Sequence, residues 1–327
     1  MLGRAHDRAT RLLDVSPAAD PAKRMLVLVN PRATRVYPSL TETLLTALAR
    51  HYHVDCVETR RPGHATALSR DATNGGYDIV TAFGGDGTVN EVANGLAGTD
   101  TPLTCLPGGR TNVFARALGI PRDVVAATDR LIHSGGRMRT RRIDTGLMNG
   151  RHFVFASGVG FGATLNARFN DRDRLKARLG EYYFAYEMLA SVARSRPGSR
   201  QRVRTTVDRR SVEGVTTIAQ NSQLLTYFGR WPVRVCENAG LATGTISLAV
   251  LKRASFRELL TLPPRAFSDR PSAVARHEQV ESFPSVRAAR VDALGDERFP
   301  VEIDGEYVGD FDAIEYGIAP RSLCVAA

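Results

Sequence analysis

Strands and helices alternate through the first third of the chain. The segments MLVLVN (25–30), YDIVTAF (77–83) and PLTCLP (102–107) are mostly apolar and have the length of strands. Segments with apolar residues every three or four positions follow them, such as PSLTETLLTALARHY (38–52). Apolar strands joined by helices indicate a parallel sheet covered on both faces. We therefore predict an α/β fold with a doubly wound parallel sheet, in which ligands bind beyond the carboxyl ends of the strands.

The pattern changes after Arg142, where several segments alternate apolar and polar residues. Four of these segments have strand length: RVRTTVD (202–208), VTTIAQN (215–221), TISLAVL (245–251) and FPVEID (299–304). Such alternation is typical of antiparallel strands with one buried face. The second part of the chain is therefore predicted to be rich in β-structure.

The composition fits two domains without a membrane span. With 327 residues, of which 43% are hydrophobic, the chain is long enough for two cores. It contains no run of about 18 apolar residues that could cross a membrane, and its N-terminus lacks the apolar stretch of a signal peptide. The cysteines show no metal-ligand spacing and are expected as reduced thiols of a cytoplasmic protein. They are Cys56, Cys105, Cys236 and Cys324.

The formal net charge is +10, and arginine supplies nearly all of the positive charge. The only lysines are Lys23, Lys176 and Lys252. This balance favours polyanionic partners: nucleic acid, an anionic membrane or phosphorylated ligands. An arginine-biased codon usage explains it equally well, so charge alone selects no partner. No recognisable nucleic-acid-binding motif accompanies the charge, and we expect no nucleic-acid partner.

Two glycine-rich turns follow predicted strands, FGGDGT (83–88) and PGGRT (107–111). Glycines let the backbone approach a ligand closely with its amide groups pointing outward, and the N-terminus of a following helix favours phosphate. The alternative is a tight strand-to-helix turn in which Asp86 or Thr88 acts only as the N-cap. Spacing alone leaves both interpretations open.

The turn at 83–88 matches neither of two common nucleotide-binding motifs. Asn90 occupies the place of the third glycine in the dinucleotide fingerprint, and the chain lacks the Gly-Lys pair of a P-loop. Without a nearby lysine, phosphates would be held by backbone amides, hydroxyls, arginine and a metal ion. Asp86 is the candidate ligand for that metal.

Four segments together resemble the catalytic-domain family of diacylglycerol kinases. They are VNPRAT (29–34), GGDGTVNEVANGL (84–96), PGGRTNVFARALGIP (107–121) and EIDGEYVG (302–309). This family comprises bacterial soluble lipid kinases that are related to sphingosine kinases and, more distantly, to NAD kinases. The resemblance extends in order from about residue 25 to the C-terminus.

The resemblance implies a two-domain kinase that uses ATP and Mg²⁺. ATP would bind to the α/β domain, and the lipid hydroxyl would enter a cleft between this domain and a β-sandwich-like second domain. We place the α/β domain at 25–143, with residues from about 310 to 327 returning to it, and the lipid-substrate domain at 144–309. Residues 1–24 are expected to form a loose N-terminal arm.

Carried over residue by residue, the resemblance assigns roles in both domains. Asp304 in EIDGE matches the aspartate proposed as general base, and Glu306 would tune it or help to hold magnesium. Asp86 is the expected metal ligand. The positions that match the nucleotide-binding segments of the family are Asn30, Pro31, Arg32, Thr34, Thr59, Gly84, Gly85, Asp86, Gly87, Thr88, Asn90, Glu91 and Thr111.

Without the family, Asp304 would be interpreted as a turn residue. Asp-Gly between strands is among the strongest signals for a two-residue hairpin turn. The catalytic role nevertheless fits chemically, because attack by a lipid alcohol on a γ-phosphate requires positioning and a proton acceptor. Mg²⁺ and the amide dipoles of residues 85–88 would counter the charge of the transferred group.

The chain departs from the family at several acidic positions. Relatives commonly read Thr-Asn-Asp-Phe, and this chain has Val113 in place of the aspartate. They also read Gly-Phe-Asp-Ala, and this chain has Gly162 in place of that aspartate. The segment LATGTIS (241–247), with Ala242 and Ser247, lacks the aspartates that bind a structural magnesium in relatives. These losses leave room for altered substrate choice, weakened catalysis or a protein that binds without catalysing.

The resemblance favours diacylglycerol as the phosphate acceptor. The alternatives are another lipid alcohol, sphingoid-like or glycolipid, and a non-catalytic nucleotide- or lipid-binding protein. An insoluble substrate implies peripheral contact of a cytoplasmic protein with the inner face of an anionic membrane. The basic and aromatic segment 171–195 either lies on such a bilayer or packs on the second sheet. The presence of a homodimer stays open.

Overall fold

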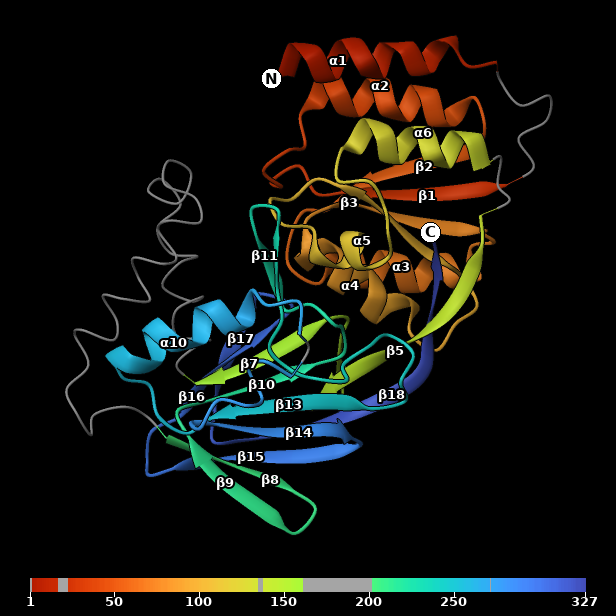
Figure 1. Ribbon diagram of the computed structural model, residues 1–327. Coiled ribbons are helices and arrows are strands. Elements are labelled where there is room, and N and C mark those ends of the chain that lie inside the picture. The colour runs from red at the N-terminus through yellow and green to blue at the C-terminus, as the bar shows by residue number, and fades with distance from the viewer. Residues whose placement is uncertain (1, 17–22, 135–137, 161–201, 271) are drawn as a thin grey trace. The chain divides into compact units, whose positions relative to one another are not determined.

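The computed structural model describes residues 2–16, 23–134, 138–160, 202–270 and 272–327 (Figure 1). The segment 171–195 and Gly162 therefore lie outside the described residues. The chain divides into two compact units, one of Met1–Ile143 with Arg321–Ala327 and one of Asp144–Pro320. Among the described residues, no helix is both long enough and apolar enough to cross a membrane.

Parallel strands form the sheet of the first unit, in the order β2-β1-β3-β4 followed by the end of β18. The strands span Arg24–Val29 (β1), His53–Glu58 (β2), Ile79–Gly84 (β3), Leu103–Pro107 (β4) and Ala313–Ala326 (β18). Every residue of β3 and β4 is buried, because these strands lie inside the sheet and helices cover them. The predicted doubly wound parallel sheet is therefore confirmed.

Helices cover both faces of this sheet. Helices α3 and α4 pack against each other on one face, whereas α2 and α6 lie together on the other (Figure 1). Helix α2 begins with a proline at its first position, and its buried leucines recur every four residues. The helices span Pro38–Ala49 (α2), His64–Asn74 (α3), Asp86–Leu96 (α4), Val113–Ala117 (α5) and Val124–Ser134 (α6).

The N-terminal segment differs from the loose arm that we expected. Its described residues form helix α1 (Leu2–Thr10) and a 3₁₀ turn, η1 (Arg11–Asp14), which contact α2. Ala9 and Leu12 are buried, and Arg8 pairs with Asp123 at 3.0 Å. The three-residue spacing of the two apolar side chains gives the segment one face that can pack, which a charge-rich composition conceals.

The strand order creates a switch point between β1 and β3. From β1 the chain moves to β2 on one side, and then crosses to β3 on the other side of β1. Loops that leave the carboxyl ends of two such strands diverge and leave a crevice in which α/β proteins bind ligands. Asn30 follows β1, and Gly85 follows β3. These two positions mark where a ligand site is expected.

The second unit contains two antiparallel layers. One layer has the strand order β14-β13-β10-β7-β16-β17, and the other contains β18, β15, β8 and β9 in that order. The first layer comprises Ala156–Gly160 (β7), Thr216–Gln220 (β10), Ile246–Leu251 (β13), Val280–Val286 (β14), Phe299–Ile303 (β16) and Glu306–Phe311 (β17). The second adds Arg202–Val207 (β8), Arg210–Gly214 (β9) and Ala288–Leu294 (β15).

Side chains of both layers meet in one core, so the unit is a β-sandwich. Val159 and Leu248 from one layer belong to the same buried cluster as Val203 and Val291 from the other. Strand β5 (Thr140–Met148) connects the two units along the chain and forms a hairpin with β6 (Arg151–Phe153). At the C-terminus, only 321–327 belong to the first unit, whereas 310–320 remain in the second, so the single strand β18 runs from the second unit into the first.

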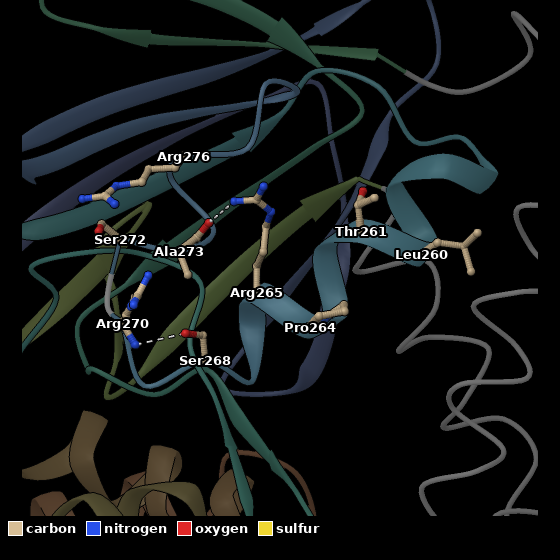
Figure 2. A pocket seen from close by; sticks show the side chains of 9 residues that line it. All are labelled: Leu260, Thr261, Pro264, Arg265, Ser268, Arg270, Ser272, Ala273 and Arg276. Carbon is tan, nitrogen blue, oxygen red and sulfur yellow. Dashed lines mark hydrogen bonds between the residues drawn. The ribbon is translucent and has the colours of Figure 1, made fainter.

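Helix α10 (Phe256–Ala266) covers the outer face of β13, and the sequence analysis assigned no helix there. Leu262 and Ala266 of α10 pack near Ala249 of β13 and other members of a second small cluster. Leu260 is exposed, and its side chain extends outward from the helix (Figure 2). Because β13 has apolar neighbours on both faces, its sequence is apolar nearly throughout.

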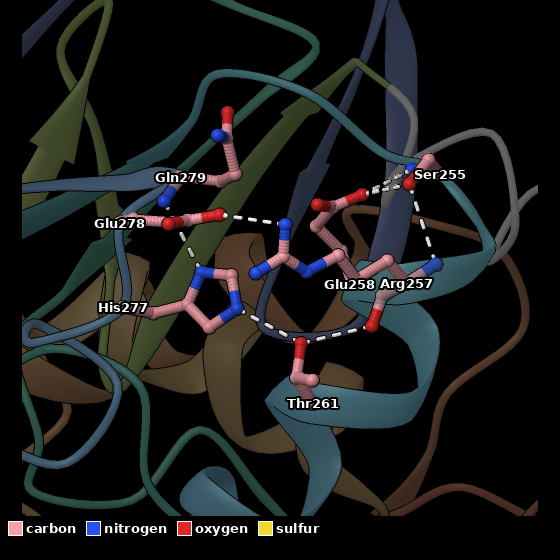
Figure 3. Close-up of polar contacts among 7 residues, drawn as sticks. All are labelled: Ser255, Arg257, Glu258, Thr261, His277, Glu278 and Gln279. Atoms are coloured by element: carbon pink, nitrogen blue, oxygen red, sulfur yellow. Dashed lines mark hydrogen bonds and ion pairs between the residues drawn. The ribbon is translucent and has the colours of Figure 1, made fainter.

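A capping box fixes the start of α10 (Figure 3). The Ser255 hydroxyl accepts a hydrogen bond from the Arg257 amide at 3.3 Å, and the Ser255 amide donates to the Glu258 carboxylate at 2.7 Å. Burial alone would raise the pKa of Glu258, but the hydrogen bonds from Ser255 and the nearby His277 outweigh it. The pKa of this carboxyl therefore lies below its ordinary value.

The capping box generates a pH-dependent prediction. A lowered folded-state pKa gives a stabilisation that is present above the unfolded value of 4.5 and is lost as the pH falls through the folded value. We expect Glu258→Gln to lower the free energy of unfolding by about 1 kcal/mol at neutral pH. Urea unfolding at a series of pH values should show this difference shrinking below the ordinary carboxyl pKa.

The matched control is Glu278→Gln, which removes an exposed partner of Arg257. An exposed ion pair contributes little, so we expect less than about 0.5 kcal/mol. A difference between wild type and Glu258→Gln that stays constant from neutral to acid pH would contradict the assigned role of the ionised carboxylate.

Candidate functional site

The two glycine-rich turns of the first unit contact each other through their backbones. The amide of Gly108 donates to the carbonyl of Gly84 at 2.8 Å. A Cβ atom added to Gly109 would lie 2.6 Å from the Cα of Gly85. Side chains are therefore excluded where the turns meet, so part of the glycine pattern serves the packing of one loop on the other.

The side chain of Asn112 stabilises the second turn. Its Oδ1 accepts from the amide of Gly109, and its Nδ2 donates to the carbonyl of the same residue, both at 2.9 Å. Asn112 has a φ of 50°, a left-handed conformation that asparagine adopts more readily than most residues. The turn is therefore held from within, immediately before helix α5 begins.

Asn30 connects the loop after β1 to the start of α4. Its amide donates to the carbonyl of Phe83 at 2.9 Å, and its Nδ2 donates to the hydroxyl of Thr88 at 3.0 Å. Its Oδ1 accepts from the amide of Arg32 at 3.0 Å. Because these contacts use both ends of the side-chain amide, Asn30 determines the shape of the loop that carries the exposed Arg32 and Thr34.

Helix α4 presents an N-terminus with no side-chain cap. Its N-cap is Gly85, which contributes no side-chain hydrogen bond. A Cβ added to Gly85 would find its nearest neighbour 3.5 Å away, an ordinary contact, so packing does not require glycine at this position. Backbone amides at such a helix start attract anions. The absence of a side chain at 85 keeps the approach to these amides open.

Asp86 is the first residue of α4, and its carboxylate accepts a hydrogen bond from the Phe114 amide at 3.1 Å. Its charge and the burial of Cys105 together raise the pKa of the Cys105 thiol, burial being the larger cause. Among the described residues, no group of three or more His, Cys, Asp or Glu side chains forms a metal site. One carboxylate fits Mg²⁺, which is commonly bound through one or two carboxylates together with phosphates and water.

Two of the predicted nucleotide-contacting residues lie in α4 and make structural contacts, one with the start of α3 and one within α4. The Glu91 carboxylate accepts from the amides of Gly63 at 2.8 Å and Ala65 at 3.0 Å, and so caps the start of α3. Asn90 is buried, and its carbonyl accepts from Asn94 Nδ2 at 2.9 Å. These contacts support the scaffold of the site, and direct contact of either residue with a nucleotide stays a prediction.

All of the predicted nucleotide-binding positions lie in the first unit, in the loops after β1, β2 and β4, at the end of β3, or in the segment from Gly85 through the first two turns of α4. Thr59 follows β2 and donates its amide to the carbonyl of Val29 at 2.8 Å, which places it beside the end of β1. Thr111 lies in the second glycine-rich turn after β4 and is partly exposed. The residues that the sequence selected therefore gather at the edge where the strand order predicts a ligand.

In the second unit, Asp304 occupies a hairpin turn between β16 and β17. Asp304 and Gly305 have φ values of 48° and 81°, and Ile303 pairs with Glu306 across the turn. This is the two-residue Asp-Gly turn that the sequence predicts. Glu306 is exposed at the first position of β17.

The Asp304 carboxylate is buried and holds a neighbouring segment by its backbone. It accepts hydrogen bonds from the amides of Val154 at 2.8 Å, Phe155 at 2.9 Å and Ala156 at 3.1 Å. The amide of Asp304 in turn donates to the carbonyl of Ala156 at 2.8 Å. Amide donors stabilise the ionised form of a carboxylate and fix its orientation. Asp304 therefore has a structural function whether or not it also accepts a proton.

The loop 241–247 is held by Asp144, a residue that the sequence analysis did not select. The amide of Gly244 donates to Asp144 Oδ2 at 2.6 Å, and the Asp144 carboxylate is almost completely buried. The Thr243 hydroxyl stabilises the same loop by donating to the carbonyls of Gly240 and Thr245. An acid inside the strand segment TRRIDTGLM was the available signal for Asp144. Val113 is buried at the start of α5.

Comparisons with known proteins agree with this arrangement. Residues 24–148 match the family model described as the diacylglycerol kinase catalytic domain, and residues 156–327 match the YegS C-terminal NAD kinase beta sandwich-like domain. The diacylglycerol kinase of Bacillus subtilis (strain 168) is 31% identical over 295 residues, which cover 88% of this chain and 91% of the relative. The diacylglycerol kinase of Staphylococcus aureus (strain bovine RF122 / ET3-1) is 27% identical over 307 residues, with coverage of 89% and 88%.

Solved structures show the same fold. A crystal structure of a diacylglycerol kinase from Bacillus anthracis str. Sterne aligns with a TM-score of 0.63 and 20% identity, and covers 93% of this chain and 96% of its own. A second solved structure from that organism gives a TM-score of 0.69 at 22% identity, with coverage of 93% and 97%. With both halves of the chain matched in order and one relative above 30% identity over most of its length, the chain belongs to the diacylglycerol kinase family.

Proposed function

We propose that this protein is an ATP- and Mg²⁺-dependent lipid kinase that transfers the γ-phosphate to the hydroxyl of diacylglycerol or a similar lipid. The observation that carries the proposal is the start of α4, whose N-terminus has no side-chain cap and lies at the switch point of the sheet. Backbone amides at this position can hold phosphate. The family of the chain and the names of its relatives support phosphoryl transfer to a lipid.

In the proposed reaction the first unit holds the nucleotide. The amides at the start of α4 bind phosphate oxygens, while the loop shaped by Asn30 and the turn that carries Thr111 position the rest of ATP. Mg²⁺ bound near Asp86 would neutralise charge on the phosphates. Asp304 accepts the proton of the lipid hydroxyl as the new O–P bond forms and the bond to the ADP oxygen breaks. The amide contacts of its carboxylate hold it in one orientation, which this role requires.

A second candidate is a non-catalytic protein that binds a nucleotide or a lipid on the same fold. The extensive backbone contacts of Asp304 and the absence of acids at Val113 and in 241–247 favour it. Incubation with labelled ATP, Mg²⁺ and non-ionic micelles of diacylglycerol, a sphingoid base or a glycolipid extract separates the alternatives. Labelled product from one lipid identifies the acceptor, whereas ATP binding without any labelled lipid contradicts the kinase proposal.

Two glycine variants test the proposed binding of phosphate by the backbone amides at the start of α4. The methyl group of Gly85→Ala meets no close neighbour, so we expect a melting temperature close to that of wild type. We expect ATP binding to weaken by about tenfold, because the methyl group would obstruct the backbone amides. Calorimetric titration with ATP and Mg²⁺ measures the change.

Gly109→Ala is the matched variant on the facing turn. Its methyl group would lie 2.6 Å from the Cα of Gly85, so we expect a loss of stability of about 1–3 kcal/mol from overpacking. Unchanged ATP affinity in a folded Gly85→Ala variant would show that the glycine turn has only a packing role.

Asp304→Asn tests the proposed proton acceptor. We expect transfer to fall about 100-fold or more while ATP binding is retained. The variant should also lose about 1–3 kcal/mol of stability, because its amide group would face backbone donors. Activity is therefore measured below the melting temperature and scaled to the folded fraction.

Asp208→Asn is the matched control for this change. Asp208 also lies in a two-residue hairpin turn, between β8 and β9, with a φ of 51°, but it is exposed. We expect wild-type transfer and stability from Asp208→Asn. Wild-type turnover in Asp304→Asn would exclude Asp304 as the proton acceptor and leave it with the structural function alone.

A further inference from the structure

A pocket of about 590 Å³ lies beside the C-terminal end of α10 (Figure 2). Its volume is in the range of small-molecule sites. The polar residues that line it are three arginines and three hydroxyl residues: Arg265, Arg270, Arg276, Thr261, Ser268 and Ser272. None of these residues belongs to the candidate site of the first unit or to the Asp304 turn.

The three arginines form a positively charged cluster whose neighbouring acids are already paired. Asp269 pairs with Arg234 at 3.2 Å, and Glu278 pairs with Arg257 at 3.3 Å. Within 202–270 and 272–327, no ion pair of Arg265, Arg270 or Arg276 is found. The pocket therefore carries positive charge that the described acids do not neutralise.

Hydrogen bonds hold the guanidinium of Arg265 and shape the loop that carries Arg270 and Arg276. Arg265 Nη1 donates to the carbonyl of Ala273 at 3.0 Å, which holds its guanidinium against the loop after α10. The amide of Arg270 donates to the Ser268 hydroxyl at 3.2 Å, and the amide of Arg276 donates to the carbonyl of Ser272 at 3.1 Å. Guanidinium groups bind phosphate oxygens through paired N–H donors. The positive charge of the three arginines therefore favours a phosphate group, and the guanidinium of Arg265 is held in place beside the pocket.

Exposed apolar side chains accompany the arginines. Leu260, which also lines the pocket, is 60% exposed, and Phe267 at the end of α10 is 37% exposed. Phe267 contacts Phe228 of the β11–β12 hairpin (Thr226–Phe228 and Trp231–Val233), with ring centroids 6.1 Å apart. Apolar side chains next to arginines are typical of surfaces that enter the interfacial layer of a bilayer. A soluble phosphate would gain nothing from them.

We propose that this pocket binds the phosphate of an anionic phospholipid, and that Leu260 and Phe267 enter the acyl boundary of the same membrane. The proposal rests on the proposed lipid kinase function, since such an enzyme must reach a substrate within a bilayer. Charge complementarity between the arginine cluster and the lipid phosphate selects the partner, and the apolar rim selects a membrane over a soluble phosphate.

Co-sedimentation of the full chain with vesicles tests the proposal. Vesicles of phosphatidylcholine are compared with vesicles that also contain phosphatidylglycerol, for wild type and for Arg265→Gln/Arg270→Gln/Arg276→Gln. Each arginine near an anionic surface strengthens binding about fivefold, so the triple variant should bind anionic vesicles about 100-fold more weakly. Leu260→Ser, a change at an exposed position, should weaken binding to anionic vesicles about tenfold, because less apolar surface would be buried in the membrane.

The matched control is Arg70→Gln/Arg209→Gln/Arg287→Gln, which removes the same charge from exposed positions outside the pocket. Arginines that stay beyond a Debye length from the membrane are screened, so we expect less than a roughly threefold change. Equal losses in the two triple variants would show that only net charge matters and would overturn the proposal. The proposal would also be overturned if Arg265→Gln/Arg270→Gln/Arg276→Gln, the pocket variant, bound anionic vesicles as strongly as wild type.

Two further measurements separate the sources of phosphate and the two proposals. One outcome is that inorganic phosphate raises the melting temperature of wild type but not of the pocket variant, while both proteins bind vesicles equally. In that case the pocket binds a soluble phosphate, and the membrane proposal is overturned. Transfer to diacylglycerol in non-ionic micelles should be equal in wild type and pocket variant. Vesicle binding that needs the pocket, without transfer by wild type, would refute the kinase function and leave the docking surface in place.

Discussion

The contact between the two glycine-rich turns is the constraint on which the candidate site depends. The hydrogen bond from Gly108 to Gly84 and the close approach of Gly109 to Gly85 join the loops after β3 and β4. The bond from Asn30 to Thr88 adds the loop after β1. These contacts leave the start of α4 at the junction of three loops, with its shape fixed before any ligand binds. Preorganisation of this kind reduces the ordering cost of binding phosphate.

Asp304 has a structural role that does not depend on the chemistry proposed for it. Its contacts with residues 154–156 join the β16–β17 turn to the start of β7, so the aspartate would be retained in this fold even without catalysis. The same contacts hold the carboxylate in one orientation. The geometry of this turn is therefore weak evidence for catalysis by itself, and phosphoryl transfer has to be judged from activity measured separately from stability.

The sequence predicted the features that local pattern controls. The apolar strands, the helix after Pro38 and the Asp-Gly hairpin follow from periodicity and turn chemistry within a few residues. It did not predict the contact of Gly109 with Gly85 or the capping of α3 by Glu91, because these depend on which strands and helices become neighbours. Helix α10 was missed because Pro263 and Pro264 lie inside it, although the Ser255 to Glu258 capping box marks its start.

Among the described residues, the arginines that form ion pairs differ in their surroundings from those that form none, and this bears on the origin of the net charge of +10. On the sandwich strands, Arg202, Arg204 and Arg290 pair with glutamate or aspartate at the surface, as expected when arginine is simply the common cation of a sequence. Such exposed pairs contribute little to stability. The cluster at the end of α10 differs, because its neighbouring acids are paired elsewhere and apolar side chains are exposed beside it. A codon bias supplies arginines throughout a chain, but it does not account for arginines placed together around one pocket with an apolar rim.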